Sequence, residues 1–348
     1  MTSAADSTND SLMLQEARSA ADCVALQLAN DVERYAELGR VLRAGTFHNA
    51  VTVARGSSDH ASNYLAYLIM SRMGRLVTSL PMSLVTLYKA PLRADGVLAI
   101  SVSQSGQSPD VVEPMRYFRA GGATTVALVN AIDSPLAEAA EWALPLRAGK
   151  EQSVAATKSF ITSLTAGARL VAEWQEDAEL KAGLAALPDA LRRAAGADWS
   201  AALDVLAPAR NIMVVGRGIG FPIALEAALK FKETSALQAE AFSGAEIKHG
   251  PMALIDEGYP LLIFATRGPT QAGLVALADE MRGRGARVLL AAPEDVPSRD
   301  LDLPVAPHPD LDPIVAIQAF YVMAAQLSKA RGLDPDKPRH LSKVTKTN

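Results

Sequence analysis

The sequence predicts an α/β fold built from two similar domains in tandem, each a doubly wound, flavodoxin-like sandwich. In such a sandwich, a parallel β-sheet is flanked by helices on both faces. Short apolar runs of strand length alternate with longer helical patterns, which is typical of parallel sheets covered by helices. The length of 348 residues exceeds one ordinary domain of roughly 150 residues and favours two. A strand–turn–helix frame also recurs in the two halves, which indicates internal duplication.

The first half carries five of these strand signals. Residues 1–11 are polar and predict a disordered tail, and residues 12–45 follow a helical pattern. Apolar runs of strand length then occur at residues 50–54, 77–80, 97–102, 125–129 and 143–146. Helical segments or loops separate them, so we expect a first domain over residues 12–165.

The second half repeats the first after an Ala- and Leu-rich helical connector, expected at residues 166–206. Gly218 follows Gly56 and Gly268 follows Gly106 at the same offset of 162 positions, each pair within a matching strand–turn–helix frame. We therefore expect a second domain over residues 207–336, followed by a basic tail at 337–348.

Composition excludes several classes of protein. A hydrophobic content of 49% and a charged content of 21% are those of an ordinary globular protein. The net charge of −4 gives no reason to expect nucleic acid or an acidic membrane as partner. The chain has no signal-peptide pattern and no apolar run of membrane-spanning length. Its one cysteine, Cys23, is interpreted as a small buried residue rather than a reactive thiol. We expect a cytoplasmic protein.

One loop favours anion binding. A buried strand ends before Ser103-Gln104-Ser105-Gly106-Gln107-Ser108, and Pro109 then opens a helical pattern. Backbone N–H groups at a helix start, together with serine hydroxyls, can hold a phosphate without an ion pair. An ordinary strand-to-helix turn with a serine cap is the alternative. In the second half, Ala265-Thr266-Arg267 replaces the serine-rich loop, so we expect only one phosphate site.

A second region favours acid–base chemistry. The helical segment 221–231 is apolar on nearly every side, yet Glu226, Lys230 and Glu233 share one face. A solvated stripe of ion pairs is the ordinary interpretation. Because the helix suits a core, we instead expect a half-buried carboxylate with a raised pKa, as a general base for a carbon-bound proton requires.

His249 precedes a Gly-Pro turn, beside Glu246 and Lys248, and is a candidate for proton transfer near neutral pH, although a lone histidine is more often structural. The segment Gly216-Arg217-Gly218-Ile219-Gly220 fails the dinucleotide fingerprint, because Phe221 stands where its third Gly would be. Spacings typical of metal ligands are also missing. The sequence predicts neither a cofactor nor a metal.

Six motifs resemble those of the tandem SIS (sugar isomerase) family, and in particular the isomerase domain of glutamine–fructose-6-phosphate aminotransferase. They are GSS at 56–58, SQSGQS at 103–108, VAATKSF at 154–160, ALEAALKFKE at 224–233, EIKHGP at 246–251 and KPRHLSKVT at 337–345. The resemblance covers the chain from about residue 12 to its end, and it implies that the tail at 337–348 closes the active site.

The resemblance implies a role for each matching residue. Glu233 would move a proton between C1 and C2, with Lys230 beside it. His249 would open the sugar ring from the neighbouring subunit, which implies a homodimer, and Lys343 would form an imine with the ketose. The residues implied to bind the sugar phosphate are Ser58, Ser103, Gln104, Ser105, Ser108, Val154 and Ser342.

Four positions depart from the family pattern. Ser108 replaces a usual Thr but keeps the hydroxyl, Gln107 replaces Glu, and Ser342 replaces Ala. Ala156 replaces Ser and loses a hydroxyl near the pocket, which leaves the sugar preference open.

The family's full synthase carries a glutaminase domain whose nucleophilic cysteine follows the initiator Met. Here Thr2 stands at that position, so we expect no glutamine-derived ammonia and hence the reverse reaction. The expected reaction converts D-glucosamine 6-phosphate and water to D-fructose 6-phosphate and ammonia. Alternatives are a galactosamine-6-phosphate deaminase or isomerase, a fructosamine-6-phosphate deglycase and a non-catalytic sugar-phosphate sensor.

Overall fold

The computed structural model describes residues 10–343, and the outer parts of both predicted tails lie outside this range. The first of its two sheets has five parallel strands in the order β2-β1-β3-β4-β5. The strands are β1 (Asn49–Val53), β2 (Val77–Ser79), β3 (Val97–Ser103), β4 (Thr124–Val129) and β5 (Trp142–Pro145). All five predicted strands are confirmed, with their ends within one residue of those expected.

The second sheet also has five parallel strands, in the order β10-β9-β8-β6-β7. They are β6 (Asn211–Gly216), β7 (Gln238–Ser243), β8 (Pro260–Phe264), β9 (Arg287–Ala292) and β10 (Leu301–Asp302). Numbered within each half, both sheets have the strand order 2-1-3-4-5, which is the flavodoxin-like order. Two tandem doubly wound domains are therefore confirmed.

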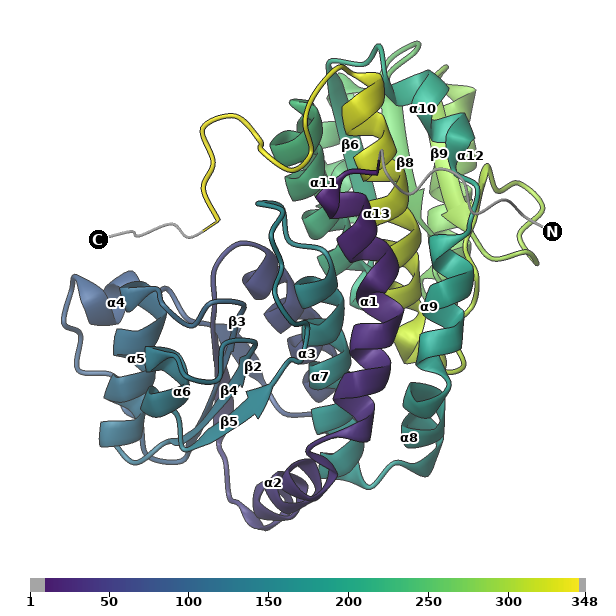
Figure 1. Cartoon of the computed structure of the whole chain (residues 1–348). Coiled ribbons are helices and arrows are strands. Elements are labelled where there is room, and N and C mark those ends of the chain that lie inside the picture. Colours follow the sequence, from purple (N-terminus) through teal and green to yellow (C-terminus); the bar gives the residue numbers. More distant parts are fainter. Residues whose placement is uncertain (1–9, 344–348) are drawn as a thin grey trace.

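Thirteen α-helices within the described residues surround the sheets (Figure 1). They are α1 (Leu12–Ala29), α2 (Val32–Ala44), α3 (Ser57–Met73), α4 (Ser83–Thr86), α5 (Pro109–Ala120), α6 (Pro135–Ala139), α7 (Lys158–Gln175), α8 (Ala178–Ala185), α9 (Leu187–Ala195), α10 (Ser200–Leu206), α11 (Phe221–Ser235), α12 (Gln271–Gly283) and α13 (Asp312–Ala330). The helical pattern predicted over 12–45 is two helices, because Asp31 adopts a left-handed conformation with φ of 56°.

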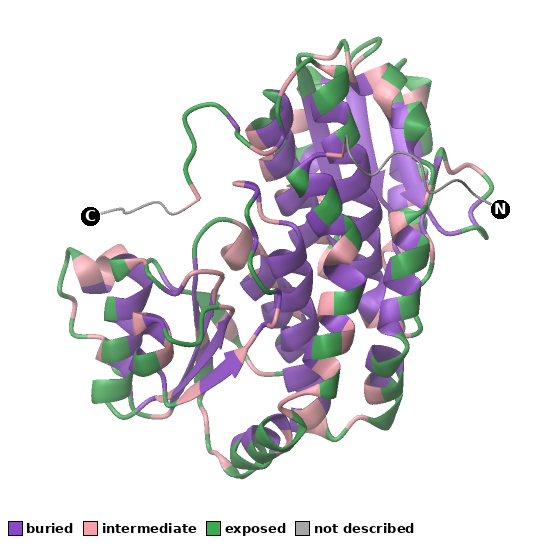
Figure 2. Cartoon of the chain, in the orientation of Figure 1, coloured by how far each residue is buried: buried purple, intermediate pink, exposed green. Residues whose placement is uncertain are grey.

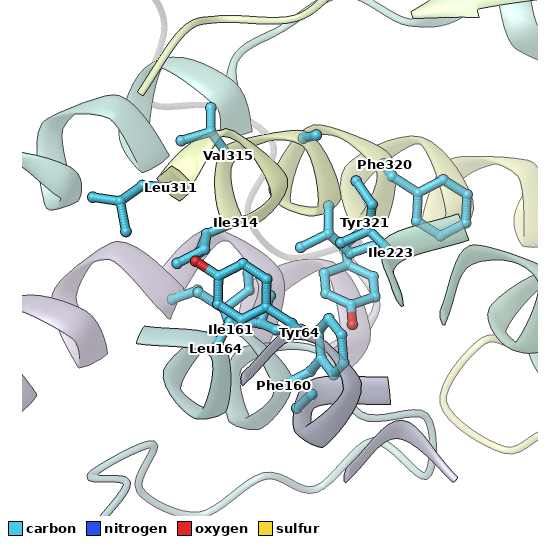
Figure 3. Close-up of a cluster of buried hydrophobic side chains, with 14 of the residues drawn as sticks. Tyr64, Phe160, Ile161, Leu164, Ile223, Leu311, Ile314, Val315, Phe320 and Tyr321 are labelled. Carbon is cyan, nitrogen blue, oxygen red and sulfur yellow. The ribbon is translucent and has the colours of Figure 1, made fainter. Parts of the chain in front are cut away.

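The two domains share one hydrophobic core. Alternate side chains of each strand point to opposite sheet faces, so Ile100 and Phe264 face this shared core while Ala99 and Ile263 face separate outer cores. Figure 3 shows side chains of α3 and α7 packed against those of α11 and α13 in the shared core. The outer helices keep solvent-exposed faces (Figure 2). The shared core fixes the two domains relative to each other, and so fixes any site between them.

Helix α7 corrects part of the predicted organisation. The expected division at residue 165 falls inside this continuous helix, which is buried along nearly its whole length and packs against α1, α2 and α3. The helical character predicted for residues 159–206 is confirmed, but its first helix belongs to the core of the first domain. The apolar pattern alone could not separate a connector helix from a core helix.

The segment 309–330, most of it α13, is the one stretch within residues 10–343 that is long and apolar enough to cross a membrane. It is 94% buried inside the protein and runs beside α1, which places it in the core of the fold (Figure 1).

Candidate active site

The serine-rich loop lies at the point where the strand order of the first sheet reverses. The loops after β1 and β3 diverge there, which is where ligands bind in doubly wound sheets. Arg55, in the loop after β1, pairs with Asp110 in the first turn of α5, with 3.2 Å between Nη2 and Oδ2. This ion pair holds the two loops side by side, with Ser58 at the start of α3 and Ser108 as the N-cap of α5.

The loop's shape depends on Gly106. Its φ is +62°, and a Cβ atom there would lie 2.1 Å from Ser134 Oγ. The hydroxyl oxygen of Ser103 accepts from Gly106 N at 2.9 Å, and that of Ser105 accepts from Gln107 N at 3.4 Å. Both hydroxyls keep their O–H donors, and the side chain of Ser108 caps no amide of α5. The donors suit a phosphate.

A narrow pocket adjoins this loop. It is lined by Ser57, Ser58, Gln104, Ala156, Ser159, Phe160 and Ser163. Its free volume of about 20 Å³ is room for roughly one water molecule. A hexose phosphate is much larger than this space.

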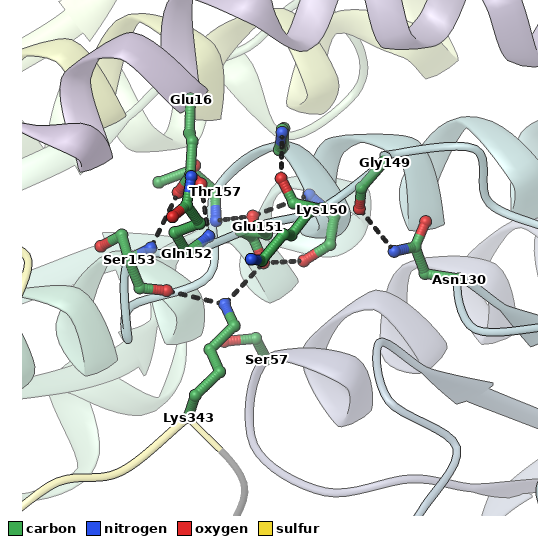
Figure 4. Close-up of polar contacts among 12 residues, drawn as sticks. Glu16, Ser57, Asn130, Gly149, Lys150, Glu151, Gln152, Ser153, Thr157 and Lys343 are labelled. Atoms are coloured by element: carbon green, nitrogen blue, oxygen red, sulfur yellow. Dashed lines mark hydrogen bonds and ion pairs between the residues drawn. The ribbon is translucent and has the colours of Figure 1, made fainter. Parts of the chain in front are cut away.

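The segment after β5 is anchored by two buried carboxylates (Figure 4). Glu151 accepts from the backbone N–H groups of Thr157 and Ser159, at 3.0 and 3.1 Å. Lys343 Nζ, from the C-terminal segment, donates to Glu151 Oε2 at 2.9 Å. One turn into α1, Glu16 accepts from Gln152 N at 2.5 Å. Burial alone would raise the pKa of Glu151, but Lys343 and the hydrogen bonds outweigh it and hold the pKa below its ordinary value.

The C-terminal segment has a second anchor. Asp336 accepts from the first two backbone N–H groups of α1, those of Leu12 and Met13, at 2.8 and 2.7 Å. A carboxylate in this position also complements the helix dipole. Asp336 therefore fixes the segment seven residues before Lys343, and Ser342 between them is exposed.

Helix α11 brings Glu226, Lys230 and Glu233 together on one face, as the sequence predicted. Glu226 and Lys230 are buried, with side-chain exposures of 0% and 1%, while Glu233 is 22% exposed. Lys230 lies 3.4 Å from Glu226 Oε1 and pairs more closely with Glu233. Burial alone would lower the pKa of Lys230, but the two carboxylates raise it above its ordinary value, so Lys230 stays an ammonium.

The sequence predicted a raised pKa for a carboxylate on this helix, and for Glu226 this prediction is wrong. Burial alone does raise it, but Lys230, with hydrogen bonds from His60 and Ser57, brings the pKa of Glu226 below its ordinary value. His60 Nδ1 is 2.9 Å from Glu226 Oε2, and Ser57 Oγ donates to Oε1 at 3.1 Å. The sequence indicated the charged face of α11, but it did not indicate that Ser57 and His60 of α3 donate hydrogen bonds to Glu226.

Glu233 faces a larger pocket of about 550 Å³ between the C-terminal half of α11 and the segment 332–341. The serine loop lines a different pocket, and the Ser57–Glu226 contact lies where the two domains meet. His249 is exposed, at the end of the 3₁₀ turn η2 (Glu246–His249), and lines neither pocket. Within one chain, Ser58 and Gln104 line the same pocket, and Lys230 pairs with Glu233. His249 joins neither pair.

Sequence reasoning did not single out Ser57, His60, Glu151 or Asp336 as site residues. His60 carried a usable signal, since it stands three positions after Ser57 in the Gly/Ser turn and shares its helix face. Within residues 10–343, no group of three or more His, Cys, Asp or Glu side chains is arranged to hold a metal ion.

Comparison with known proteins identifies the family. The SIS domain model matches residues 47–172 and 205–329. The chain is 34% identical over 309 residues to the glutamine–fructose-6-phosphate aminotransferase of Zymomonas mobilis, covering 84% of this chain and 51% of that protein. It thus spans about half the length of the curated relatives it matches.

Solved structures agree with this result. A candidate phosphosugar isomerase from Silicibacter pomeroyi DSS-3 is 39% identical, with a TM-score of 0.89, and covers 94% of this chain and 100% of that one. A glucosamine-6-phosphate deaminase from Thermotoga maritima shares the fold at 21% identity, with a TM-score of 0.78, covering 97% and 100% of the two chains. The chain belongs to the SIS domain family of phosphosugar isomerase-type proteins and carries two SIS domains in tandem.

Proposed function

We propose that this chain is an amino-sugar phosphate deaminase/isomerase, which converts D-glucosamine 6-phosphate and water to D-fructose 6-phosphate and ammonia. The observation that carries the proposal is the Glu226–Lys230–Glu233 cluster, whose outer carboxylate faces a pocket. A module that only binds sugar phosphates needs the serine loop but not a buried ammonium between two carboxylates. The Thermotoga deaminase, which shares the fold over its whole length, supports the same chemistry.

The proposed reaction begins at the serine loop, where Ser58, Ser103, Gln104, Ser105 and Ser108 hold the phosphate through hydroxyl, amide and backbone donors. The loop brings no cation of its own, so neutral donors set the affinity.

Proton transfer follows ring opening. Glu233 removes the proton from C2 and delivers it to C1. Over the same step O1 gains a proton and the nitrogen loses one, which converts the 2-amino aldose to a C2 imine. Water then adds to C2, ammonia leaves, and the C2 carbonyl of the ketose forms. The ammonium of Lys230 keeps Glu233 oriented through the ion pair.

His249 opens the ring in this proposal. Because His249 lines neither pocket of its own chain, we propose a homodimer in which a second copy supplies it. Lys343 is the proposed imine-forming lysine. Its ion pair with Glu151 must break before the amine can reach a carbonyl carbon, so the ion-paired arrangement is the resting state. A cytoplasmic location is part of the same proposal and fits a metabolic enzyme with one cysteine.

The deciding experiment measures ammonia release from glucosamine 6-phosphate, galactosamine 6-phosphate and fructoselysine 6-phosphate in parallel, with lysine release also measured for the last. Ammonia from glucosamine 6-phosphate well above the others supports the proposal. Amine release only from the fructosamine phosphate reassigns the chain to the deglycases. No release from any substrate, with tight sugar-phosphate binding, contradicts an enzymatic role.

A further inference from the structure

His60 joins the two domains at the acid–base helix. It stands in the first turn of α3, in the phosphate-binding domain, and its Nδ1 atom reaches Oε2 of Glu226 on α11, at 2.9 Å. Its side chain is only 17% exposed, and Glu226 is fully buried. Nothing in the proposed reaction so far uses this histidine.

The tautomer of His60 follows from its partner. The pKa of Glu226 lies below its ordinary value, because Lys230 and the hydrogen bonds outweigh burial, so Glu226 is ionised near neutral pH. A carboxylate can only accept hydrogen bonds, so Nδ1 of His60 carries the hydrogen that joins them. His60 is then a fixed donor to Glu226 whether its ring is neutral or charged.

The two oxygens of Glu226 have different partners. Oε1 accepts from Ser57 at 3.1 Å and from Tyr321 at 3.0 Å, and Lys230 lies 3.4 Å away. Within residues 10–343, His60 is the donor that reaches Oε2. Hydrogen bonds from Ser57, Tyr321 and His60 thus stabilise the Glu226 carboxylate alongside Lys230, and Lys230 makes its closer contact with Glu233.

Lys230 is therefore shared between two competing carboxylates. Removing the donor to Oε2 leaves a buried carboxylate oxygen unpaired, which is costly unless a cation moves toward it. Lys230 is the cation within reach, and its shift toward Glu226 would weaken the ion pair with Glu233.

We propose that His60 is a positioning residue for the acid–base helix: by donating to Glu226, it leaves Lys230 to orient Glu233 at the pocket wall. This inference rests on the proposed function for its activity measurement only. The described groups that face the cluster come from three helices, namely Ser57 and His60 of α3, Glu226, Lys230 and Glu233 of α11, and Tyr321 of α13.

The test compares His60→Asn with His60→Leu. The Asn side chain offers an N–H donor near the position of Nδ1, whereas Leu offers none. We expect kcat for ammonia release to fall about 10- to 100-fold in His60→Leu, the cost typical of losing an orienting partner of a reactive group. KM for the sugar phosphate should stay within about threefold, because the serine loop is untouched, and His60→Asn should retain most of the wild-type kcat.

A purely structural role predicts a different pattern. Loss of stability alone would lower the melting temperature without lowering the kcat of the folded enzyme. The inference is overturned if His60→Leu keeps the wild-type kcat, or if Asn and Leu impair kcat equally in folded protein.

A second measurement needs no activity. Nitrogen-15 NMR of the wild-type protein, with the His60 signal assigned by its loss in His60→Asn, should show a protonated Nδ1 throughout pH 6–8. A neutral ring protonated only at Nε2 overturns the inference. If the wild-type protein releases ammonia from no substrate, the proposed function fails, and this spectrum still tests whether His60 donates to Glu226.

Discussion

Lys343 Nζ donates to Glu151 Oε2 at 2.9 Å and to the backbone carbonyl of Ser153 at 2.7 Å, so the C-terminal segment is held against the loop that follows β5. This contact joins residues 192 positions apart and brings a lysine from the C-terminal segment to Glu151 (Figure 4). A lysine here can clamp the loop as an ammonium or react as an amine. The two roles make different demands on its side chain.

Substitution of Lys343 separates these roles. Lys343→Arg keeps a cation and several donors for Glu151 but cannot form an imine, while Lys343→Met loses both functions. We expect both variants to lose turnover by about 100-fold or more, the lower range for a group acting directly in catalysis. Ammonia release measures turnover, and calorimetry with fructose 6-phosphate measures binding. Near-wild-type kcat in Lys343→Arg would contradict imine formation and leave only the clamp.

Glu233→Gln tests the proposed base. The amide keeps the size of the side chain and its acceptor oxygen but cannot remove a proton from carbon, so kcat should fall by about 10²- to 10⁴-fold. Affinity for fructose 6-phosphate should change little, because the proposed phosphate-binding residues are those of the serine loop and of Ser58, which the substitution leaves intact. Glu257→Gln, at an exposed turn, is the matched control and should retain full activity. A Glu233→Gln variant with wild-type turnover would exclude this residue as the base.

The serine loop can be tested at its glycine. Gly106→Ala introduces a side chain at φ of +62°, which costs about 1–2 kcal/mol for the left-handed backbone alone, and the new Cβ collides with Ser134. Gly122→Ala is the control, because Gly122 has φ of +88° but no atom within 4 Å of the point that a Cβ would occupy. Urea unfolding should show the larger destabilisation in Gly106→Ala, and only this variant should bind fructose 6-phosphate more weakly. Equal effects of both substitutions on binding would show that the loop tolerates a side chain.

The sheets and the duplication could be predicted because their signals are local. A strand such as β3 is an apolar run bounded by turn residues, and the glycine pairs keep a common offset of 162 positions in the sequence. Gly106 and Gly268 both adopt positive φ, as a repeated turn requires. The shared face of Glu226, Lys230 and Glu233 was likewise visible, since helical spacing alone places them together.

Contacts between distant segments could not be predicted in this way. His60 and Glu226 are 166 positions apart, and Asp336 and Leu12 are 324 positions apart, so no spacing rule connects them. The direction predicted for the pKa shift of the Glu226 carboxylate was wrong for the same reason. Burial can be inferred from an apolar helix, but the donors that outweigh it come from α3, which the fold alone brings near.

The stability of the protein in acid should depend on two buried glutamates whose pKa values are shifted in opposite directions. The pKa of Glu151 is lowered in the folded protein, since Lys343 and hydrogen bonds outweigh burial, so its contribution is present above the unfolded pKa of about 4.3 and is lost as pH falls. The pKa of Glu16 is raised chiefly by burial, so its contribution is present below that pKa and is lost as pH rises through the folded value.

Urea unfolding between pH 3 and 7 can measure both contributions. Glu151→Gln should flatten the fall in the free energy of unfolding on acidification, because the folded protein no longer resists protonation at that site. Glu16→Gln should make this fall steeper, because it removes a group that stabilises the folded protein at low pH. The two substitutions thus change the pH dependence of the free energy of unfolding in opposite directions. A general loss of stability would instead lower this free energy by the same amount at every pH. A parallel shift in both variants would mean that neither carboxylate titrates as its surroundings require.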